Sequence, residues 1–478
     1  MKKVFSLLLL LFVAANVASA QEAPQSRLFT PAQMHQDLDS MYAWINATHP
    51  NLYLQVKKEK ADKVWEQARA QLKRPMTRVE FAKIVFPVTS QYKDGHTGLG
   101  FDFSDEEFQK YYEEGGRFFP LGVKVQEGQL YVTEVAKGQS IKPGASITKI
   151  NGRKAEELVQ EMLPYWPADN KPNQEATLSR LFGFTLWYLY GWGNDVEVEY
   201  SNYGERKKQV AQLQGVGEDT FFHYIGFGSR DYKLTIHEQE SLAVLELFNF
   251  KPKMKELTAF LDSAFAVLQE RNIQHLAIDL RRSGGGYSGV GAKVLQYVTD
   301  KPFDLTVARE QYRSLVLPSK SYNKGFYQNN MAAYDGKYVN NRYKSVAHPQ
   351  QPEPLKNPEL FYEGKIYLLT APRTFSSSHM MAAAVKGYKL ATVIGEATGN
   401  NNHFMGEVIN FQLPNTGWWG MCSTAQYWAA GITEATKYKG VQPDVEVKQS
   451  IKDLAADKDT VLEYLKESIR TGKVAAAE

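Results

Sequence analysis

Apolar positions recur every three or four residues near the start of the chain and every second residue further on. The helical spacing runs from Leu28 to about Phe108, as in "PAQMHQDLDSMYAWINATHP" and "KADKVWEQARAQL". From about Arg117 the period shortens to two in "FFPLGVKVQEGQLYVTEVAKG", which is typical of half-buried strands. The pattern therefore predicts a helical N-terminal region followed by a β-rich region.

The rhythm changes again from about Leu234, where apolar strand-like runs alternate with helical stretches. The order is "LAVLELFNF", "KMKELTAFLDSAFAVLQERN" and "HLAIDLR", and it returns later with "KIYLLT", a helix to Tyr388 and "LATVIGE". Residues 302–360 are polar, aromatic and poorly periodic, and we expect them to form an excursion over the sheet. A closing helix is expected in "TVLEYLKESIR". Alternating strands and helices predict an α/β core.

The first twenty residues, "MKKVFSLLLLLFVAANVASA", have two lysines, a short apolar run and small residues at their end. This pattern predicts a secretory signal peptide cleaved after Ala20, and hence a periplasmic or secreted protein. Cleavage removes Lys2 and Lys3, so the formal net charge falls from +3 to +1. We therefore expect no nucleic-acid partner, and no integral membrane segment is expected after cleavage.

Composition narrows the chemistry further. The only cysteine is Cys422, so no intramolecular disulfide can form. The nine histidines show no HExxH or other metal-binding spacing, and "RSGGGYSG" lacks the lysine of a phosphate-binding loop. We expect neither a metal nor a cofactor.

Three serines, Ser376, Ser377 and Ser378, stand where "KIYLLT" ends and an alanine-rich helical pattern begins. A residue at such a corner lies at the carboxyl rim of the sheet, where open α/β folds bind ligands. The unpaired amides of a helix start suit an oxyanion, so one serine could be a nucleophile. One of them could equally be only the helix cap.

Two loops bear on that choice. The first is "DLRRSGGGYSG", in which a strand runs into a glycine triplet that lets backbone amides approach a substrate. The second is "KDGHTGL", which holds His96 on a loop that could reach a cleft. His49, in "HPNLY", is interpreted as a helix stop before proline.

Taken together, these segments and their order resemble the S41 peptidases, the family of C-terminal-processing (tail-specific) and tricorn-like serine proteases. The resemblance covers most of the chain and includes "TFSSSHMMAAAVKGYKLATVIGEATGN" and "GVQPDVEV". It implies a multidomain α/β protein with an N-terminal helical cap, a PDZ-like β-rich domain and a ClpP/crotonase-like peptidase core. The expected boundaries are a signal peptide at 1–20, then 21–112, 113–204 and 205–478.

The resemblance implies site residues when its motifs are carried over. Ser376 would be the nucleophile, and the amide of Ser377 with that of Gly285 or Gly284 would form the oxyanion hole. The tail-specific branch uses a lysine about 25 residues after the nucleophile, where this chain has Asn401.

The tricorn-like branch instead takes its base from an N-terminal loop, which makes His96 the expected general base. His403 is a rival. The group that orients His96 is left open among Asp94, Glu396 and Glu434.

Three further positions depart from the family pattern. Gly95 stands where the tricorn-like branch has a serine before its histidine, and Lys437 stands where that branch has a glutamate. Ser283 replaces a frequent asparagine of the glycine loop.

The hypothesis is an exported serine endopeptidase that cuts polypeptides by acyl transfer, with substrates bound through the PDZ-like domain. One alternative is a catalytically inactive peptide- or ligand-binding protein on the same fold. Another is an esterase that uses the same residues on a different substrate.

Overall fold

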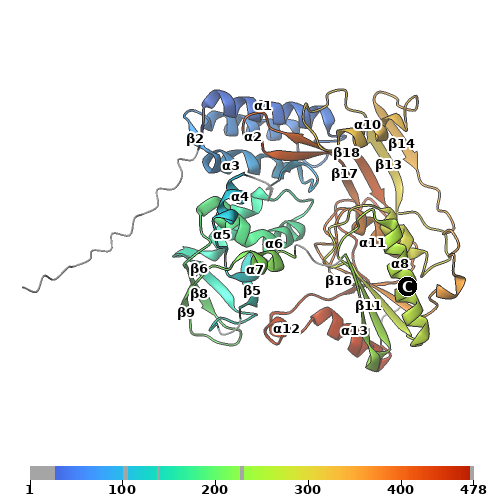
Figure 1. Ribbon diagram of the computed structural model, residues 1–478. Coiled ribbons are helices and arrows are strands. Elements are labelled where there is room, and N and C mark those ends of the chain that lie inside the picture. The colour runs from blue at the N-terminus through green and yellow to red at the C-terminus, as the bar shows by residue number, and fades with distance from the viewer. Residues whose placement is uncertain (1–26, 101–105, 137–138, 227–230, 474–478) are drawn as a thin grey trace, which may run out of the picture.

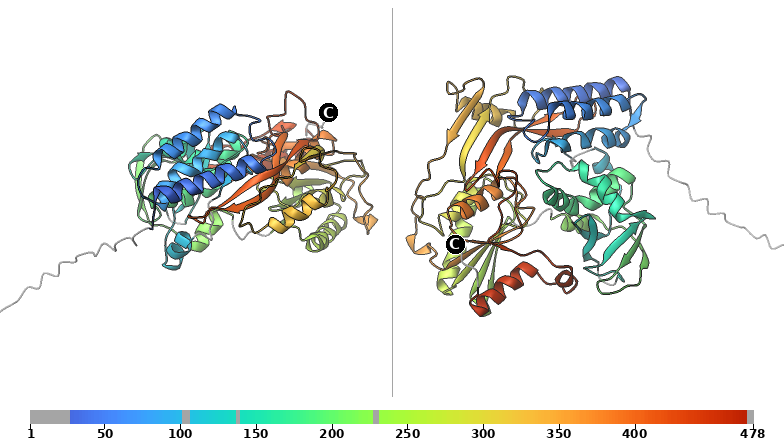
Figure 2. Two further views of the ribbon diagram at one scale, coloured as in Figure 1. Left: turned by 90° about the horizontal axis from the view of Figure 1, so that it is seen from above. Right: turned by 180° about the vertical axis from the view of Figure 1, so that it is seen from behind.

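The computed structural model describes residues 27–100, 106–136, 139–226 and 231–473. The expected signal peptide lies outside these residues. The described part is a mixed α/β structure with several sheets, which Figure 1 shows from one side and Figure 2 from above and behind. None of its helices is long and apolar enough to cross a membrane.

Antiparallel helices form the N-terminal region. Threonines cap two of them, because the side chains of Thr30 and Thr77 each accept the backbone amide three residues later, and their own backbone amides donate to the side chain of Gln33 or Glu80. The helical spacing of the sequence is thus confirmed. Its elements are α1 (Pro31–Thr48), α2 (Lys58–Gln71), α3 (Arg78–Val85) and the 3-10 helix η1 (Phe86–Tyr92), with short strands β1 (Leu28–Phe29) and β2 (Met76–Thr77).

The β-rich region is an antiparallel sheet in the order β4-β5-β6-β8-β9, with β7 paired to β6. Strand β4 lies at the edge of this sheet and pairs only with β5. Helix α6 (Lys171–Tyr190) packs along β4. The other elements are α4 (Glu106–Glu113), β4 (Leu121–Gln126), β5 (Gln129–Val135), β6 (Ser146–Ile150), β7 (Arg153–Lys154), α5 (Ala155–Met162), η2 (Leu163–Tyr165), β8 (Val196–Ser201), β9 (Gln209–Leu213) and α7 (Glu218–Tyr224).

The C-terminal half contains a six-stranded sheet in the order β10-β11-β12-β15-β16-β19. All of its pairings except β10 with β11 are parallel. The strands are β10 (Tyr232–His237), β11 (Leu242–Leu247), β12 (His275–Asp279), β15 (Lys365–Thr370), β16 (Thr392–Gly395) and β19 (Val445–Glu446).

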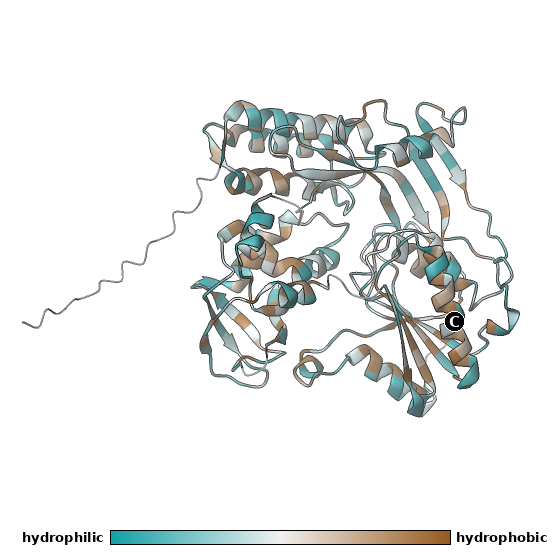
Figure 3. Ribbon diagram, in the orientation of Figure 1, coloured by the Kyte–Doolittle hydropathy of each residue, from teal (hydrophilic) through white to brown (hydrophobic). Residues whose placement is uncertain are grey.

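Helices cover both faces of this sheet, and its central strands carry apolar residues throughout (Figure 3). Leu276 and Ile278 of β12 face one helical layer, whereas Ala277 faces the other. The first layer is α8 (Met254–Glu270), α9 (Gly289–Leu295) and α11 (Ser377–Gly387), and the second is α13 (Thr460–Thr471), preceded by α12 (Ile451–Ala455). The α/β rhythm expected from the sequence is confirmed here.

A second sheet, in the order β14-β13-β18-β17, stands beside the first (Figure 1). It includes part of the segment expected only as an excursion, since residues 302–360 contain two strands and a helix. Its elements are β13 (Thr306–Tyr312), α10 (Lys324–Ala332), β14 (Arg342–Val346), η4 (Pro358–Leu360), β17 (His403–Gln412) and β18 (Trp419–Ala429). Strand β3 (Gly98–Leu99) pairs with β18 and so joins the N-terminal region to this sheet.

Candidate active site

The three serines at the start of α11 have different partners. Ser376 has a backbone φ of 56° and ψ of −127°, a strained conformation for a residue with a side chain. The hydroxyl of Ser377 donates to the carbonyl of Gly286 at 2.6 Å, and that of Ser378 bonds to the hydroxyl of Ser283 at 2.6 Å. Among the described residues, Ser376 is the one of the three whose hydroxyl has no recorded hydrogen bond to the glycine loop.

His96 lies beside that hydroxyl. Its Nε2 is 3.1 Å from Ser376 Oγ, although 280 residues separate the two in the chain. The imidazole stacks on Phe375, with ring centroids 4.6 Å apart, and only 9% of His96 is exposed. Burial lowers the pKa of His96, against the opposing effects of Asp94 and the Met405 backbone. A lowered pKa keeps the ring neutral, as a proton acceptor must be.

Asp94 holds the loop that carries His96. Its carboxylate accepts the His96 amide at 2.8 Å, His49 Nε2 at 3.0 Å, the Thr97 hydroxyl at 2.6 Å and the Ser423 hydroxyl at 2.8 Å. Burial alone would raise the pKa of Asp94, but the hydrogen bond and charge of His49 keep it below its usual range. His49 therefore does two things: it ends α1 as its C-cap, and its side chain is hydrogen-bonded to Asp94.

Asp94 Oδ1 is also 3.8 Å from His96 Nδ1, too far for a hydrogen bond but close for a charge. The other two candidate orienting acids do not contact His96. Glu396 faces Lys124 and Lys448, and Glu434 is an exposed partner of Lys437.

The rival base, His403, begins β17 and faces another group. Its Nε2 is 3.1 Å from the side-chain oxygen of Gln426, and its ring stacks on Trp428. Within the described residues it makes no recorded contact with Ser376.

The glycine loop approaches the strained serine closely. Gly285 has a φ of +87°, and a Cβ there would be 2.7 Å from the Ser377 amide nitrogen and 2.8 Å from Ser376 Cβ. A Cβ at Gly284 would meet nothing within 4 Å. Gly285 therefore packs directly against Ser376 and the backbone amide of Ser377, and leaves no room for a side chain.

Gly95, Asn401 and Lys437, three of the residues at which the sequence departs from the S41 pattern, have the following surroundings. A Cβ at Gly95 would be 2.7 Å from the Phe375 ring, so the stacked phenyl leaves no room for a serine there. Asn401, in the place of the lysine, is fully buried, and its amide donates to Asp169 at 3.1 Å. Lys437 pairs with Glu434.

Sequence reasoning missed Asp169, which precedes α6 and is buried between both loops. It accepts the Gly95 amide at 3.0 Å and the Asn400 side-chain amide at 3.0 Å. Asn400 in turn accepts the backbone N–H of Ser376. Burial and the charge of Asp94 raise the pKa of Asp169. One carboxyl group thus links the loop of His96 to the backbone of Ser376.

The arrangement is suited to nucleophilic acyl transfer, because an imidazole lies 3.1 Å from a hydroxyl at a strained corner beside a glycine loop. Among the described residues, no group of three or more His, Cys, Asp or Glu side chains is placed to hold a metal ion.

Comparisons with known proteins add a family and a fold. The family model described as peptidase family S41 matches residues 241–447, and no curated protein matches. The structure titled mature CPAF complexed with lactacystin has a TM-score of 0.64 at 13% identity, covering 92% of this chain and 98% of that one. A structure of mature CPAF alone has a TM-score of 0.61 at 13% identity, covering 93% and 99%. These likenesses show a shared fold.

Proposed function

We propose that this chain, whose residues 241–447 match the model of peptidase family S41, is a serine-type peptidase that hydrolyses polypeptides with Ser376 as nucleophile and His96 as general base. The observation that carries the assignment is the 3.1 Å separation between His96 Nε2 and Ser376 Oγ, on a strained strand-to-helix corner.

In the proposed mechanism, His96 Nε2 takes the proton of Ser376 as Oγ bonds to the carbonyl carbon of the substrate. The amides of Ser377 and Gly285 stabilise the resulting oxyanion, and each such donor is worth roughly 3 kcal/mol in the transition state. The imidazolium then gives its proton to the leaving amine. Water, deprotonated by His96, finally cleaves the acyl-enzyme. The nearby Asp94 carboxylate stabilises the imidazolium by its charge.

We further propose that the β-rich region at 113–204 is a PDZ-like domain that binds the substrate. Support comes from a cavity of about 460 Å³ between β4, α6 and the carboxyl ends of β12 and β15, lined by Leu121, Val123 and Pro372 among others. The N-terminal region at 21–112 would be the helical cap that supplies His96. The sequence pattern at 1–20 supports export, so the proposed location is the periplasm or the exterior.

A fluorophosphonate probe tests the nucleophile. Wild type is expected to become labelled and to degrade casein, and Ser376→Ala is expected to abolish labelling and lower proteolysis by about 10⁴-fold or more. His96→Ala is expected to cause a comparable loss. Ser263→Ala, on the exposed side of α8, is the control and is expected to label normally.

An unlabelled wild type that folds normally would support the ligand-binding alternative instead. Rapid turnover of short p-nitrophenyl esters without casein cleavage would favour the esterase.

A further inference from the structure

Three arginines from separate elements line one end of the cavity between the β-rich region and the core. Arg180 comes from α6, Arg282 follows β12, and Arg373 follows β15. Arg282 stands three residues before Gly285, and Arg373 stands three residues before Ser376. Two of these side chains therefore belong to the loops that carry the proposed catalytic groups.

Two of the guanidinium groups approach the same point. A single point, the position of a Cβ on Gly226, is 3.7 Å from Arg282 Nη2 and 3.9 Å from Arg373 Nη1. Burial, with the charges of Arg180 and Arg282, lowers the pKa of Arg373 to about 9. Like charges this close repel one another in a partly buried site.

Three of the acidic residues that line the same cavity are engaged elsewhere. Glu175 accepts the backbone amides of Glu127 and Gly128, and Glu134 pairs with His223. Glu396 interacts with Lys124 and Lys448.

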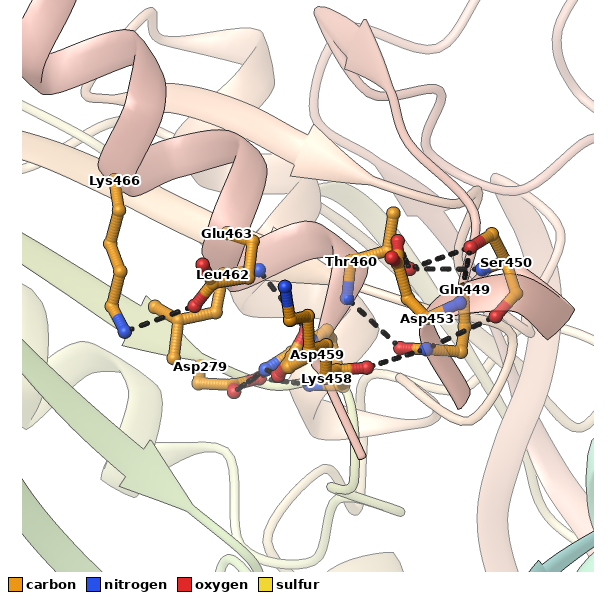
Figure 4. A network of polar contacts seen from close by, with 11 residues as sticks. Asp279, Gln449, Ser450, Asp453, Lys458, Asp459, Thr460, Leu462, Glu463 and Lys466 are labelled. Atoms are coloured by element: carbon orange, nitrogen blue, oxygen red, sulfur yellow. Dashed lines mark hydrogen bonds and ion pairs between the residues drawn. The ribbon is translucent and has the colours of Figure 1, made fainter. Parts of the chain in front are cut away.

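The adjacent Arg281 contrasts with the three arginines, because it is paired with Asp279 and Asp459, two of the carboxylates in the network of Figure 4. Across the described residues, no carboxylate forms an ion pair with Arg180, Arg282 or Arg373. The cluster thus lacks the counter-charge that Arg281 has.

A planar guanidinium binds a carboxylate through paired N–H groups, and clustered arginines are suited to acidic ligands. We propose that Arg180, Arg282 and Arg373 bind acidic side chains of the polypeptide substrate, so that cleavage is favoured beside Asp or Glu. This inference rests on the proposed peptidase function and adds a substrate class to it. The cluster would hold an acidic segment of the substrate in this cavity, at the start of the two loops that carry Gly285 and Ser376.

The test begins by mapping the bonds that wild type cuts in casein by mass spectrometry. A peptide spanning one such bond is then compared with its Glu→Gln counterpart. Wild type is expected to cleave the glutamate peptide with a kcat/KM on the order of tenfold higher, a preference that added NaCl reduces. Arg373→Gln and Arg282→Gln are expected to abolish the preference while keeping fluorophosphonate labelling.

Arg206→Gln is the matched control, because Arg206 is exposed in the turn between β8 and β9. If Arg373→Gln does not fold, the exposed Arg282 carries the test. A charge-reversed Arg282→Glu is expected to favour a lysine peptide. An equal rate on both peptides would overturn the inference, and so would a dependence only on a free rather than an amidated C-terminus. If the wild-type protein is neither labelled by the fluorophosphonate nor cleaves casein, the proposed peptidase function itself is overturned.

Discussion

At the scale of single residues, the site depends on backbone conformations that few side chains tolerate. Ser376 adopts a positive φ despite its Cβ, which is the kind of strain that exposes a side chain at a strand-to-helix corner. Gly285 also has a positive φ, and it lies against Ser376 and the Ser377 amide. The proposed oxyanion hole therefore depends on the absence of a side chain at position 285.

A pair of glycine substitutions tests this dependence. Gly285→Ala places a Cβ 2.6 Å from the Phe375 carbonyl oxygen, so the loop must shift away from Ser376. We expect kcat to fall by about 10²-fold or more, as after loss of one oxyanion donor. Gly284→Ala meets nothing within 4 Å and is expected to keep near wild-type turnover. Equal kinetics for the two variants in a casein assay would contradict this role.

The sequence predicts some of these residues better than others. Ser376 and His96 stand in motifs with a fixed order, so a single chain is enough to propose them. Asp169 lies in "WPADNKP", which has the composition of an ordinary turn before a helix. Its importance comes from partners 74 and 231 residues away, Gly95 and Asn400, and no local pattern encodes them.

At the scale of elements, the segment before α6 connects the β-rich region to the core. Asn170 caps α6 and its side chain donates to the Gly399 carbonyl at 2.9 Å, while Asn173 donates to the Pro372 carbonyl at 2.8 Å. Asp169 stands at the head of this segment. A movement of α6 would therefore displace the loops that contain Pro372 and Gly399, which lie before and after Ser376 in the chain.

Asp169 should make the free energy of unfolding depend on pH. The pKa of Asp169 is raised in the folded protein to about 7. At pH values between the ordinary aspartate pKa of about 4 and this raised value, the folded state therefore binds more protons than the unfolded state. Its contribution to stability is then full at low pH and is lost as pH rises, by up to about 1.4 kcal/mol per pH unit. Asp169→Asn cannot titrate, so the difference in unfolding free energy between wild type and variant should fall as pH rises. If urea titrations from pH 4 to 8 give a constant difference in unfolding free energy between wild type and Asp169→Asn, the raised pKa of Asp169 is refuted.

Strands β13 and β14 illustrate an element that the sequence pattern hides. Arg309 and Glu310 lie in the middle of β13 and are partly buried, where they pair with Glu407 and Arg342. Ion pairs replace apolar contacts along this strand, so the period-two signal that identified β4 and β5 is absent. The core strands were predictable because helices cover both faces and require apolar residues throughout.

At the scale of the whole molecule, the proposed base and nucleophile come from opposite ends of the chain. The β17–β18 hairpin brings them together, since β18 pairs with β3, next to the loop of His96, and belongs to the sheet beside the core. The turn of this hairpin is held by Asp37 of α1. This fully buried carboxylate accepts the amides of Asn415 and Thr416 at 2.8 and 2.9 Å and the Thr416 hydroxyl at 2.7 Å.

Removing that carboxylate should loosen the N-terminal region and the site together. Asp37→Ala leaves several buried donors without an acceptor, which should lower the free energy of unfolding by about 3 kcal/mol. It should also reduce fluorophosphonate labelling, because the loop of His96 is attached through the same hairpin. Asp37→Asn keeps one acceptor oxygen and should lose less of both. Asp39, two residues further along α1 and exposed, provides a control in Asp39→Ala, because its surface ion pair with Arg69 should contribute little to stability. Labelling that stays at the wild-type level while Asp37→Ala unfolds at lower urea would show that the hairpin does not transmit the position of α1 to His96.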